Sequence, residues 1–150
     1  MPQKCVYTTQ SLKGYRFLTH RNDLIIDRQE SEAVEVIFTV LEPGQQSFLH
    51  MHRDCEQLWY ILEGRGRLFI GADREHPEEH AVRQGDVVLT RRNLYHSIEN
   101  TGEGVLRYLA VDVFVGERNP DEPTWDAHVA ALCRQNDCEL TVEEVHYEPS

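Results

Sequence analysis

The middle of the chain is a succession of short segments rich in β-branched and aromatic residues, and this feature most constrains the fold. The first segment is VEVIFTVLEPG, residues 34–44, which ends in a Pro-Gly turn. It is followed by SFLHMH, QLWYILEG, GRLFIG, GDVVLT, HSIEN and LRYLAVDVFVG. Because each segment stops at glycine, asparagine or a charged cluster, the pattern predicts an all-β sandwich or barrel. A chain of 150 residues, 40% of them hydrophobic, is long enough for one domain with one core.

The residues after the last segment follow a helical pattern instead. In DEPTWDAHVAALCRQND, residues 121–137, apolar side chains recur at the spacing of one helix face. Asp121 can cap this helix, Pro123 suits its first turn, and Asn136 can end it. We expect the helix to pack against the outside of the sheet, and residues 138–150 to form an edge strand or to stay loose. The apolar positions are Trp125, Val129, Leu132 and Cys133.

Charge and hydropathy exclude several classes of partner. The net charge of −11 argues against nucleic acid and anionic membranes, because binding phosphate needs clustered lysine and arginine. No apolar run approaches the roughly 18 residues of a membrane-spanning helix, and the N-terminal residues lack the apolar stretch of a secretory signal. We therefore expect a cytoplasmic protein with reduced thiols. The spacing of the four cysteines matches neither a zinc ribbon nor a thioredoxin-like motif.

Two histidines open the candidate site. Five residues separate Gly44 from His50, and His52 follows two positions later. Residues two apart on a strand share a face, so both imidazoles can reach one ion, and imidazole suits zinc, iron, nickel and copper. The stretch continues through Gln57 to Gly64 and reads G-x5-H-x-H-x4-Q-x6-G.

A third histidine comes from a second stretch. Residues 85–100 read G-x5-R-x-N-x2-H-x3-N, with Arg91, Asn93, His96 and Asn100 at the named positions. A strand runs into a turn here, and His96 opens the next strand. Asn93 suits a left-handed turn position, because asparagine adopts that conformation more readily than most residues.

Together the two stretches resemble the paired motifs of the cupin family, G-x5-H-x-H-x3,4-E-x6-G and G-x5-P-x-G-x2-H-x3-N. Every spacing fits, and the resemblance covers about residues 34–115. It implies an all-β fold, the double-stranded β-helix or jelly-roll barrel, in a small single-domain protein with a short C-terminal helix. We expect one domain over residues 1–150, with the core barrel at about 34–115, an N-terminal strand segment at 1–33, and the helix and tail at 118–150.

The chain departs from the family where the first motif has its acid. Gln57 satisfies the spacing both from His52 and to Gly64, whereas Glu56 satisfies only the spacing from His52. Adjacent strand residues face opposite sides, so both cannot be ligands without a bulge. The resemblance and this count predict a metal site of His50, His52, Gln57 and His96. Cys55 is a further candidate ligand that would favour zinc or copper.

The predicted ligand set is uncharged, and this has chemical consequences. A Gln carbonyl cancels none of the charge of a divalent ion, so hard ions such as manganese and magnesium should bind less well. We expect one divalent transition metal per chain, zinc or iron, with nickel, copper or manganese as alternatives. The ion should be a stronger Lewis acid. Glu56 is a candidate base, as are a tyrosine and a metal-bound hydroxide, and Arg91 is a candidate group for holding a substrate carboxylate.

The family resemblance implies a metal-dependent enzyme acting on a small organic molecule. Lewis-acid chemistry of the isomerase, lyase or cyclase type is favoured over an iron-dependent dioxygenase, and a non-catalytic small-molecule or sugar-binding module is the alternative. Cupins commonly form homodimers, and the strand-like pieces VYTT and DLIID, residues 6–9 and 23–27, could mediate pairing here. We expect His76 and His80 to be solvated and His128 to lie on the helix surface.

Overall fold

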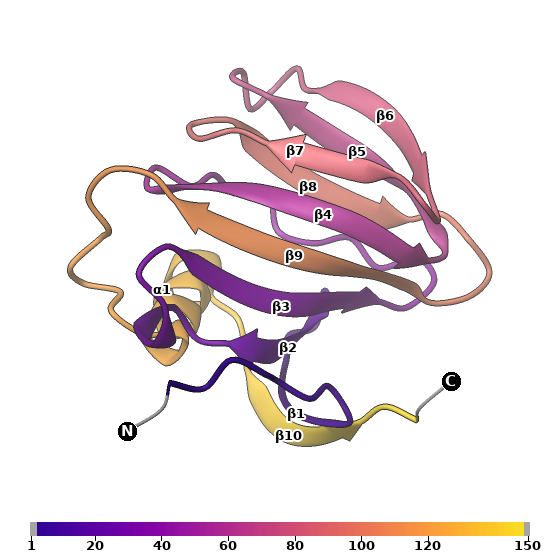
Figure 1. The fold of residues 1–150 in the computed structure, drawn as a ribbon. Coiled ribbons are helices and arrows are strands. Elements are labelled where there is room, and N and C mark those ends of the chain that lie inside the picture. The colour runs from indigo at the N-terminus through magenta and orange to yellow at the C-terminus, as the bar shows by residue number, and fades with distance from the viewer. Residues whose placement is uncertain (1–2, 149–150) are drawn as a thin grey trace.

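The computed structural model describes residues 3–148, so the extreme ends of the predicted domain and of its two terminal segments, residues 1–2 and 149–150, lie outside the described residues. Two antiparallel sheets face each other (Figure 1). One has the order β10-β1-β2-β3-β9-β4-β7 and the other β6-β5-β8. The strands are β1 (Ser11–Arg16), β2 (Arg21–Ile26), β3 (Val34–Leu41), β4 (Cys55–Glu63), β5 (Arg65–Gly71), β6 (Glu78–Arg83), β7 (Val87–Thr90), β8 (Tyr95–Asn100), β9 (Leu106–Phe114) and β10 (Thr141–His146). The helices are the 3-10 turn η1 (Arg28–Glu30) and α1 (Trp125–Asn136).

The strand order confirms the predicted all-β jelly-roll barrel. Strand β9 lies between β3 and β4, so strands far apart in the sequence are neighbours in the sheet. Side chains alternate along β4: Trp59 and Ile61 are buried, whereas Leu58 and Tyr60 are exposed. The buried face packs against Ile98 of β8 in the opposite sheet, so the core fills the space between the sheets.

Two turns of the motifs depend on unusual backbone angles. Gly64, between β4 and β5, has a φ of 86°, and a Cβ there would lie 2.4 Å from the carbonyl oxygen of Val105. Only glycine fits this position without a shift of the backbone. Asn93, in the turn before β8, has a φ of 67°, which confirms the left-handed position predicted for it.

Some local predictions differ from the structure. The segment predicted as a strand at SFLHMH, residues 47–52, forms only one isolated bridge to β8, His50 with His96, and a second bridge, Gln46 with Glu99, lies just before it. VYTT, residues 6–9, is not a strand, whereas most of DLIID lies in β2. Of the two outcomes expected for residues 138–150, the edge strand is confirmed, because β10 pairs along the whole of β1 at the edge of the large sheet.

Helix α1 begins later than the sequence pattern indicates. Its N-cap is Thr124, whose Oγ1 accepts a hydrogen bond from the Ala127 N–H at 3.1 Å, so the cap predicted at Asp121 is wrong. The backbone N–H of Trp125 donates a hydrogen bond to the Asp27 carboxylate at 3.1 Å, a contact with a distant part of the chain. The end at Asn136 is as predicted.

The expected packing of the helix outside the sheet is also wrong. Trp125 and Val129 are 2% and 1% exposed and belong to the same hydrophobic core as Trp59 of β4. The helix therefore closes one side of the barrel interior. Within residues 3–148, none of the helices combines the length and the apolar character needed to cross a membrane.

Candidate metal centre

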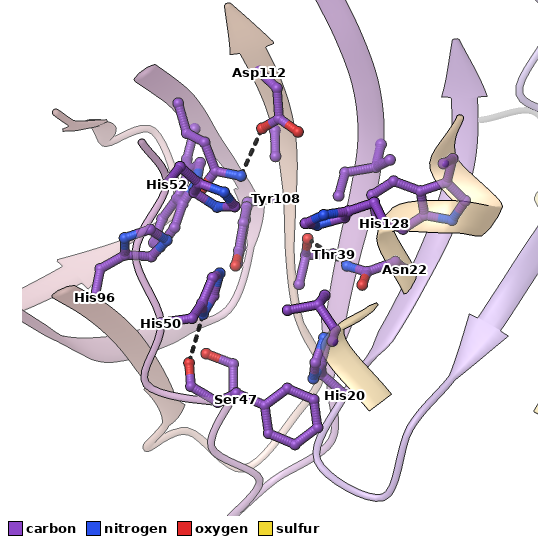
Figure 2. A pocket seen from close by; sticks show the side chains of 17 residues that line it. His20, Asn22, Thr39, Ser47, His50, His52, His96, Tyr108, Asp112 and His128 are labelled. Carbon is purple, nitrogen blue, oxygen red and sulfur yellow. Dashed lines mark hydrogen bonds between the residues drawn. The ribbon is translucent and has the colours of Figure 1, made fainter. Parts of the chain in front are cut away.

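Three histidines converge inside the barrel and form the imidazole cluster, His50, His52 and His96. His50 and His52 come from the extended segment before β4, and His96 comes from β8 (Figure 2). The backbones of His50 and His96 exchange two hydrogen bonds, of 3.1 and 2.8 Å, which fixes the two chains side by side. One nitrogen from each ring lies within 4.8 Å of the others, a separation that one metal ion can bridge.

The ring nitrogens of this cluster are arranged for ligation. His50 Nδ1 lies 2.8 Å from the Phe48 carbonyl oxygen, and His96 Nδ1 lies 3.3 Å from that of Leu94. A carbonyl can only accept, so each Nδ1 carries the proton and each Nε2 keeps a free lone pair. The Nε2 atoms of His52 and His96 are buried and have no hydrogen-bond partner among the described residues.

Burial also keeps these rings neutral. It lowers the pKa of His50 to about 4 and holds those of His52 and His96 well below their usual value, and the neighbouring imidazoles lower the latter two further. Neutral imidazole is the form that binds a metal. A buried acceptor without a donor is costly, so the donor set fits a transition metal better than it fits a packed core.

Gln57 faces the cluster from β4, and its amide is held at both ends. Trp59 Nε1–H donates to Gln57 Oε1 at 3.1 Å, and Gln57 Nε2 donates to Asp112 Oδ1 at 2.6 Å. Because an indole N–H can only donate, the carbonyl must face Trp59, and this fixes the orientation of the amide. The carbonyl keeps a second lone pair for a metal. Glu56 lies on the opposite face of β4, beside Val113 of β9, and does not line the cavity.

Behind Gln57 lies the ion-pair network, Arg28, Glu35 and Asp112, all at most 4% exposed. The Arg28 guanidinium donates two hydrogen bonds to Glu35, at 2.7 and 2.9 Å. Burial opposes the charge on Glu35, but these hydrogen bonds outweigh it and hold the pKa of Glu35 below its ordinary value. Burial and the nearby Glu35 carboxylate raise the pKa of Asp112 well above its usual range, which favours the protonated acid as a hydrogen-bond donor to Glu35.

Two adjoining cavities lie against the imidazole cluster. The inner chamber, about 40 Å³, is lined by the cluster together with Gln57 and Trp125, and Trp125 Nε1 is a third buried atom without a partner among residues 3–148. The outer vestibule, about 690 Å³, includes Arg53 and Arg74 in its walls. The two cavities share the walls formed by His50, His52, His128 and Leu132. The inner chamber is large enough for an ion with a very small ligand.

His128 reaches the inner chamber from α1, across from the cluster (Figure 2). Its ring centroid lies 5.9 Å from that of His52, and its Nδ1 lies 2.8 Å from Glu122 Oε1. Asn119 donates to the other oxygen of Glu122 at 2.5 Å, so the carboxylate is fixed. The prediction of His128 on the helix surface is wrong, because the residue is only 9% exposed.

The remaining candidates lie elsewhere. Arg91 is exposed in the turn after β7 and lines neither cavity. Cys55 is buried and lines the vestibule, but burial raises the pKa of its thiol, so it is not poised as a thiolate ligand. His76 and His80 are exposed, as expected.

Sequence reasoning missed His20, Asp112 and the Arg28–Glu35 pair. A signal existed for the two acids, because Glu35 and Asp112 occupy positions of β3 and β9 whose alternation points inward. A charged residue at such a position indicates a buried network rather than a plain core.

Comparison with known proteins agrees with the geometry. The family model described as the cupin domain matches residues 37–112. An oxalate-binding protein of Thermotoga maritima is 37% identical over 75 residues, 50% of this chain and 58% of the relative, so this chain spans less than two thirds of that protein. An uncharacterized protein of Methanocaldococcus jannaschii is 34% identical over 103 residues, 69% of this chain and 74% of the relative.

The fold has solved counterparts as well. The crystal structure of a predicted oxalate decarboxylase from Thermotoga maritima superposes with a TM-score of 0.64 at 23% identity, covering 74% of this chain and all of that one. At this identity the likeness concerns the fold alone. The family match over half of the sequence, the relative from Methanocaldococcus jannaschii and the jelly-roll architecture agree: the chain belongs to the cupin family.

Proposed function

We propose that this cupin is a metal-dependent enzyme that acts on a small carboxylate by Lewis-acid chemistry. The observation that carries the proposal is the pair of buried Nε2 atoms, on His52 and His96, that have no partner among the described residues. A folded protein retains such atoms at a cost in stability, and metal binding offsets that cost. The proposed ligands are the imidazole cluster and Gln57.

The uncharged ligand set favours zinc or iron, with nickel and copper as alternatives, over manganese. When bound, the ion would polarise a carboxylate or carbonyl oxygen of the substrate. Asp112 and Trp59 would keep the Gln57 carbonyl turned toward the chamber, through the hydrogen bonds of 2.6 and 3.1 Å described above.

The substrate class follows from the inner chamber. Trp125 Nε1–H is a buried donor that lacks an acceptor among residues 3–148. The Nε2 atoms of His52 and His96 are buried acceptors that lack a hydrogen-bond donor there and could bind a metal ion instead. A ligand that satisfies all three sites binds the ion and also accepts a hydrogen bond, as a carboxylate does. The 40 Å³ chamber restricts this ligand to a very small one. The oxalate-binding relative points to the same class.

His128 is the proposed proton-transfer group. Its Nδ1 is engaged with the Glu122 carboxylate, which leaves Nε2 for the chamber, and a carboxylate–imidazole pair of this kind is a common general base. His128 thus replaces Glu56 as the proposed base, because the side chain of Glu56 lies on the other face of β4. Arg53 and Arg74, in the vestibule walls, would attract the anion in place of Arg91.

Two other functions remain as alternatives with distinct readouts. A non-catalytic carboxylate-binding protein is favoured by the oxalate-binding relative. It would bind oxalate without consuming it. An iron-dependent dioxygenase would consume oxygen together with its substrate, whereas zinc-dependent chemistry would not depend on oxygen.

The first experiment is the metal content of protein purified without added metal. We expect about one equivalent of metal in the wild type and loss of metal in His96→Ala and Gln57→Ala. Gln57→Glu should bind metal, unlike Gln57→Ala, and its metal preference should shift toward manganese. A wild type that neither contains metal nor takes it up would overturn the proposal, and loss in His96→Ala alone would remove Gln57 from the ligand set.

The second experiment tests the ligand class with metal-loaded protein and oxalate in calorimetry and ¹³C NMR. Trp125→Phe should keep its metal but bind oxalate roughly 10- to 100-fold more weakly, the effect of one hydrogen bond to a charged acceptor. Tyr60→Phe, on the exposed face of β4, is the matched control and should bind normally. Oxalate that binds but is not consumed would favour the binding protein. Oxalate that does not bind at all would contradict the carboxylate assignment.

We also propose a homodimer through the outer face of β4 and β7. Four apolar residues there form cross-strand pairs, Leu58 with Leu89 and Tyr60 with Val87, and are 39–67% exposed. An exposed apolar patch of this kind is typical of an interface. Tyr60→Lys should give a monomer in light scattering, whereas Val142→Lys, equally exposed on β10, should not. A wild type that is monomeric contradicts the proposal.

A further inference from the structure

Two cysteines at the end of α1 lie against each other. Cys133 is in the last turn of the helix, and Cys138 follows two residues after the helix ends. Their Sγ atoms are 2.6 Å apart, and the Cys138 N–H donates to the Cys133 carbonyl oxygen at 3.2 Å. Between them Asp137 adopts a left-handed conformation, with φ 48°, which turns the chain back on itself. The backbone thus holds the two side chains together.

The other cysteines have different surroundings. Cys5 is exposed near the N-terminus, with its Sγ 3.4 Å from the Gln3 carbonyl oxygen. Cys55 is buried in β4 at the wall of the vestibule. Among the described residues, Cys133 and Cys138 therefore form the one pair of adjacent thiols. Both are partly buried and pack against the hydrophobic core, so the pair is fixed on both sides.

We propose that Cys133 and Cys138 are a reversible disulfide site. The oxidant class is a small-molecule disulfide such as oxidised glutathione. One cysteine thiolate attacks it, forming a mixed disulfide and releasing one glutathione thiolate. The second cysteine then gives up its proton and attacks the mixed disulfide, which forms the Cys133–Cys138 bond and releases the second glutathione. Two protein thiols are oxidised and one glutathione disulfide is reduced.

The bond would tie the end of α1 to the chain that leads into β10. Helix α1 supplies Trp125, His128 and Leu132 to the inner chamber. Strand β10 is in turn paired with β1 in the large sheet. Oxidation would thus fasten the C-terminal end of the helix that walls the chamber, whereas the reduced pair leaves that end held by packing and hydrogen bonds.

The pair should exchange slowly with oxidised glutathione. Burial, followed by the hydrogen bond with Cys138, raises the pKa of Cys133 to about 11. Because the thiolate is the reactive form, Cys133 exchanges slowly near neutral pH. The protein is therefore incubated with oxidised glutathione until the number of free thiols is constant, and a second sample is incubated with dithiothreitol.

Tryptic mapping gives a direct readout, because Arg134 lies between the two cysteines. After free thiols are blocked and the protein is denatured, trypsin separates Cys133 in peptide 119–134 from Cys138 in peptide 135–150. In the oxidised sample we expect one joined species of these two peptides, lighter than their sum by two hydrogen atoms and separated by dithiothreitol. Of the four cysteines, two should remain open to alkylation.

Variants locate the bond. Cys133→Ser and Cys138→Ser should each abolish the joined peptide, whereas Cys5→Ser and Cys55→Ser should leave it unchanged. Hydrogen exchange at the last turn of α1 should slow on oxidation in the wild type and stay constant in Cys138→Ser. Four alkylated cysteines after exposure to oxidised glutathione, or a bond that involves Cys5 or Cys55, would overturn the proposal. The wild-type map alone decides this if a variant does not fold.

Discussion

The imidazole cluster and the ion-pair network lie on either side of Gln57, but they differ in whether their buried polar groups have hydrogen-bond partners. In the cluster, His52 and His96 each keep a buried nitrogen without a partner among the described residues. In the network, the Glu35 carboxylate receives two hydrogen bonds from Arg28, and Asp112 bonds both Glu35 and Gln57. Both regions bury polar groups, but only one leaves them unsatisfied.

This difference separates a binding role from a structural one. A satisfied network costs little once formed and holds its shape, whereas an unsatisfied buried acceptor lowers stability until something binds it. Gln57 joins the two regions, because its Nε2 donates to Asp112, its carbonyl accepts from Trp59, and the residue lines the inner chamber beside the cluster. The network should therefore control the fold and the position of Gln57, and the cluster should control metal binding.

The largest effect should come from breaking the network. Arg28→Met leaves the Glu35 carboxylate buried without its cation, and this should cost roughly 3–5 kcal/mol in the free energy of unfolding, measured with urea. The double variant Arg28→Met/Glu35→Met should recover most of that loss, because the uncompensated charge is gone. A single variant as stable as the wild type would show that the network is not structural.

Removing a ring from the cluster should abolish the stabilisation that the metal provides. With metal at about 100 times its dissociation constant, binding should add about 2.7 kcal/mol to the unfolding free energy of the wild type. His96→Ala should lose this gain, which urea unfolding with and without metal would measure. His20→Ala, a cavity residue outside the cluster, is the control and should keep the gain. Equal gains in wild type and His96→Ala would separate the cluster from metal binding.

The link at Gln57 can be tested through Asp112. Asp112→Ala removes the acceptor of the Gln57 amide and should weaken metal binding roughly 10- to 100-fold, as loss of a supporting group usually does. Asp112→Asn has the shape and hydrogen bonds of the protonated acid, accepting from Gln57 and donating to Glu35, so it should bind metal nearly as well as the wild type. A competitive chelator titration compares the two. If both variants bind equally weakly, shape is not what Asp112 supplies.

The same contrast explains which features the sequence could predict. Strand β3 depends on a local run of β-branched residues that ends in a Pro-Gly turn, and the histidines of the cluster depend on short spacings within the two motifs, so the sequence predicts both. The ion-pair network joins β3, β9 and η1, and His128 enters the chamber from a helix outside the matched family region. These contacts depend on strand order, which no short stretch of sequence specifies.

Another buried imidazole, that of His20, should lower the stability of the fold in acid. Burial lowers the pKa of His20 to about 3, and the nearby His50 lowers it further. The unfolded chain takes up the proton below its ordinary pKa of about 6.5, so His20 removes stability as the pH falls from about 6.5 toward 3, by up to roughly 1.4 kcal/mol per pH unit. His20→Phe should reduce the slope of unfolding free energy against pH in that window. An unchanged slope would mean that His20 titrates normally in the fold.

The smallest effect concerns the start of α1, where the sequence offered two capping residues and the fold uses the second. Thr124 accepts a hydrogen bond from the Ala127 N–H, whereas Asp121 caps nothing and is exposed in the preceding loop. Thr124→Ala should lower the unfolding free energy by about 1 kcal/mol, and Asp121→Ala should leave it nearly unchanged. Pro123 explains the choice, because it disfavours helical backbone at Glu122 and so places the cap after the proline. Pro123 also keeps Glu122 outside the helix, where it bonds His128. A loss in Asp121→Ala equal to that in Thr124→Ala would contradict the assignment of the cap to Thr124.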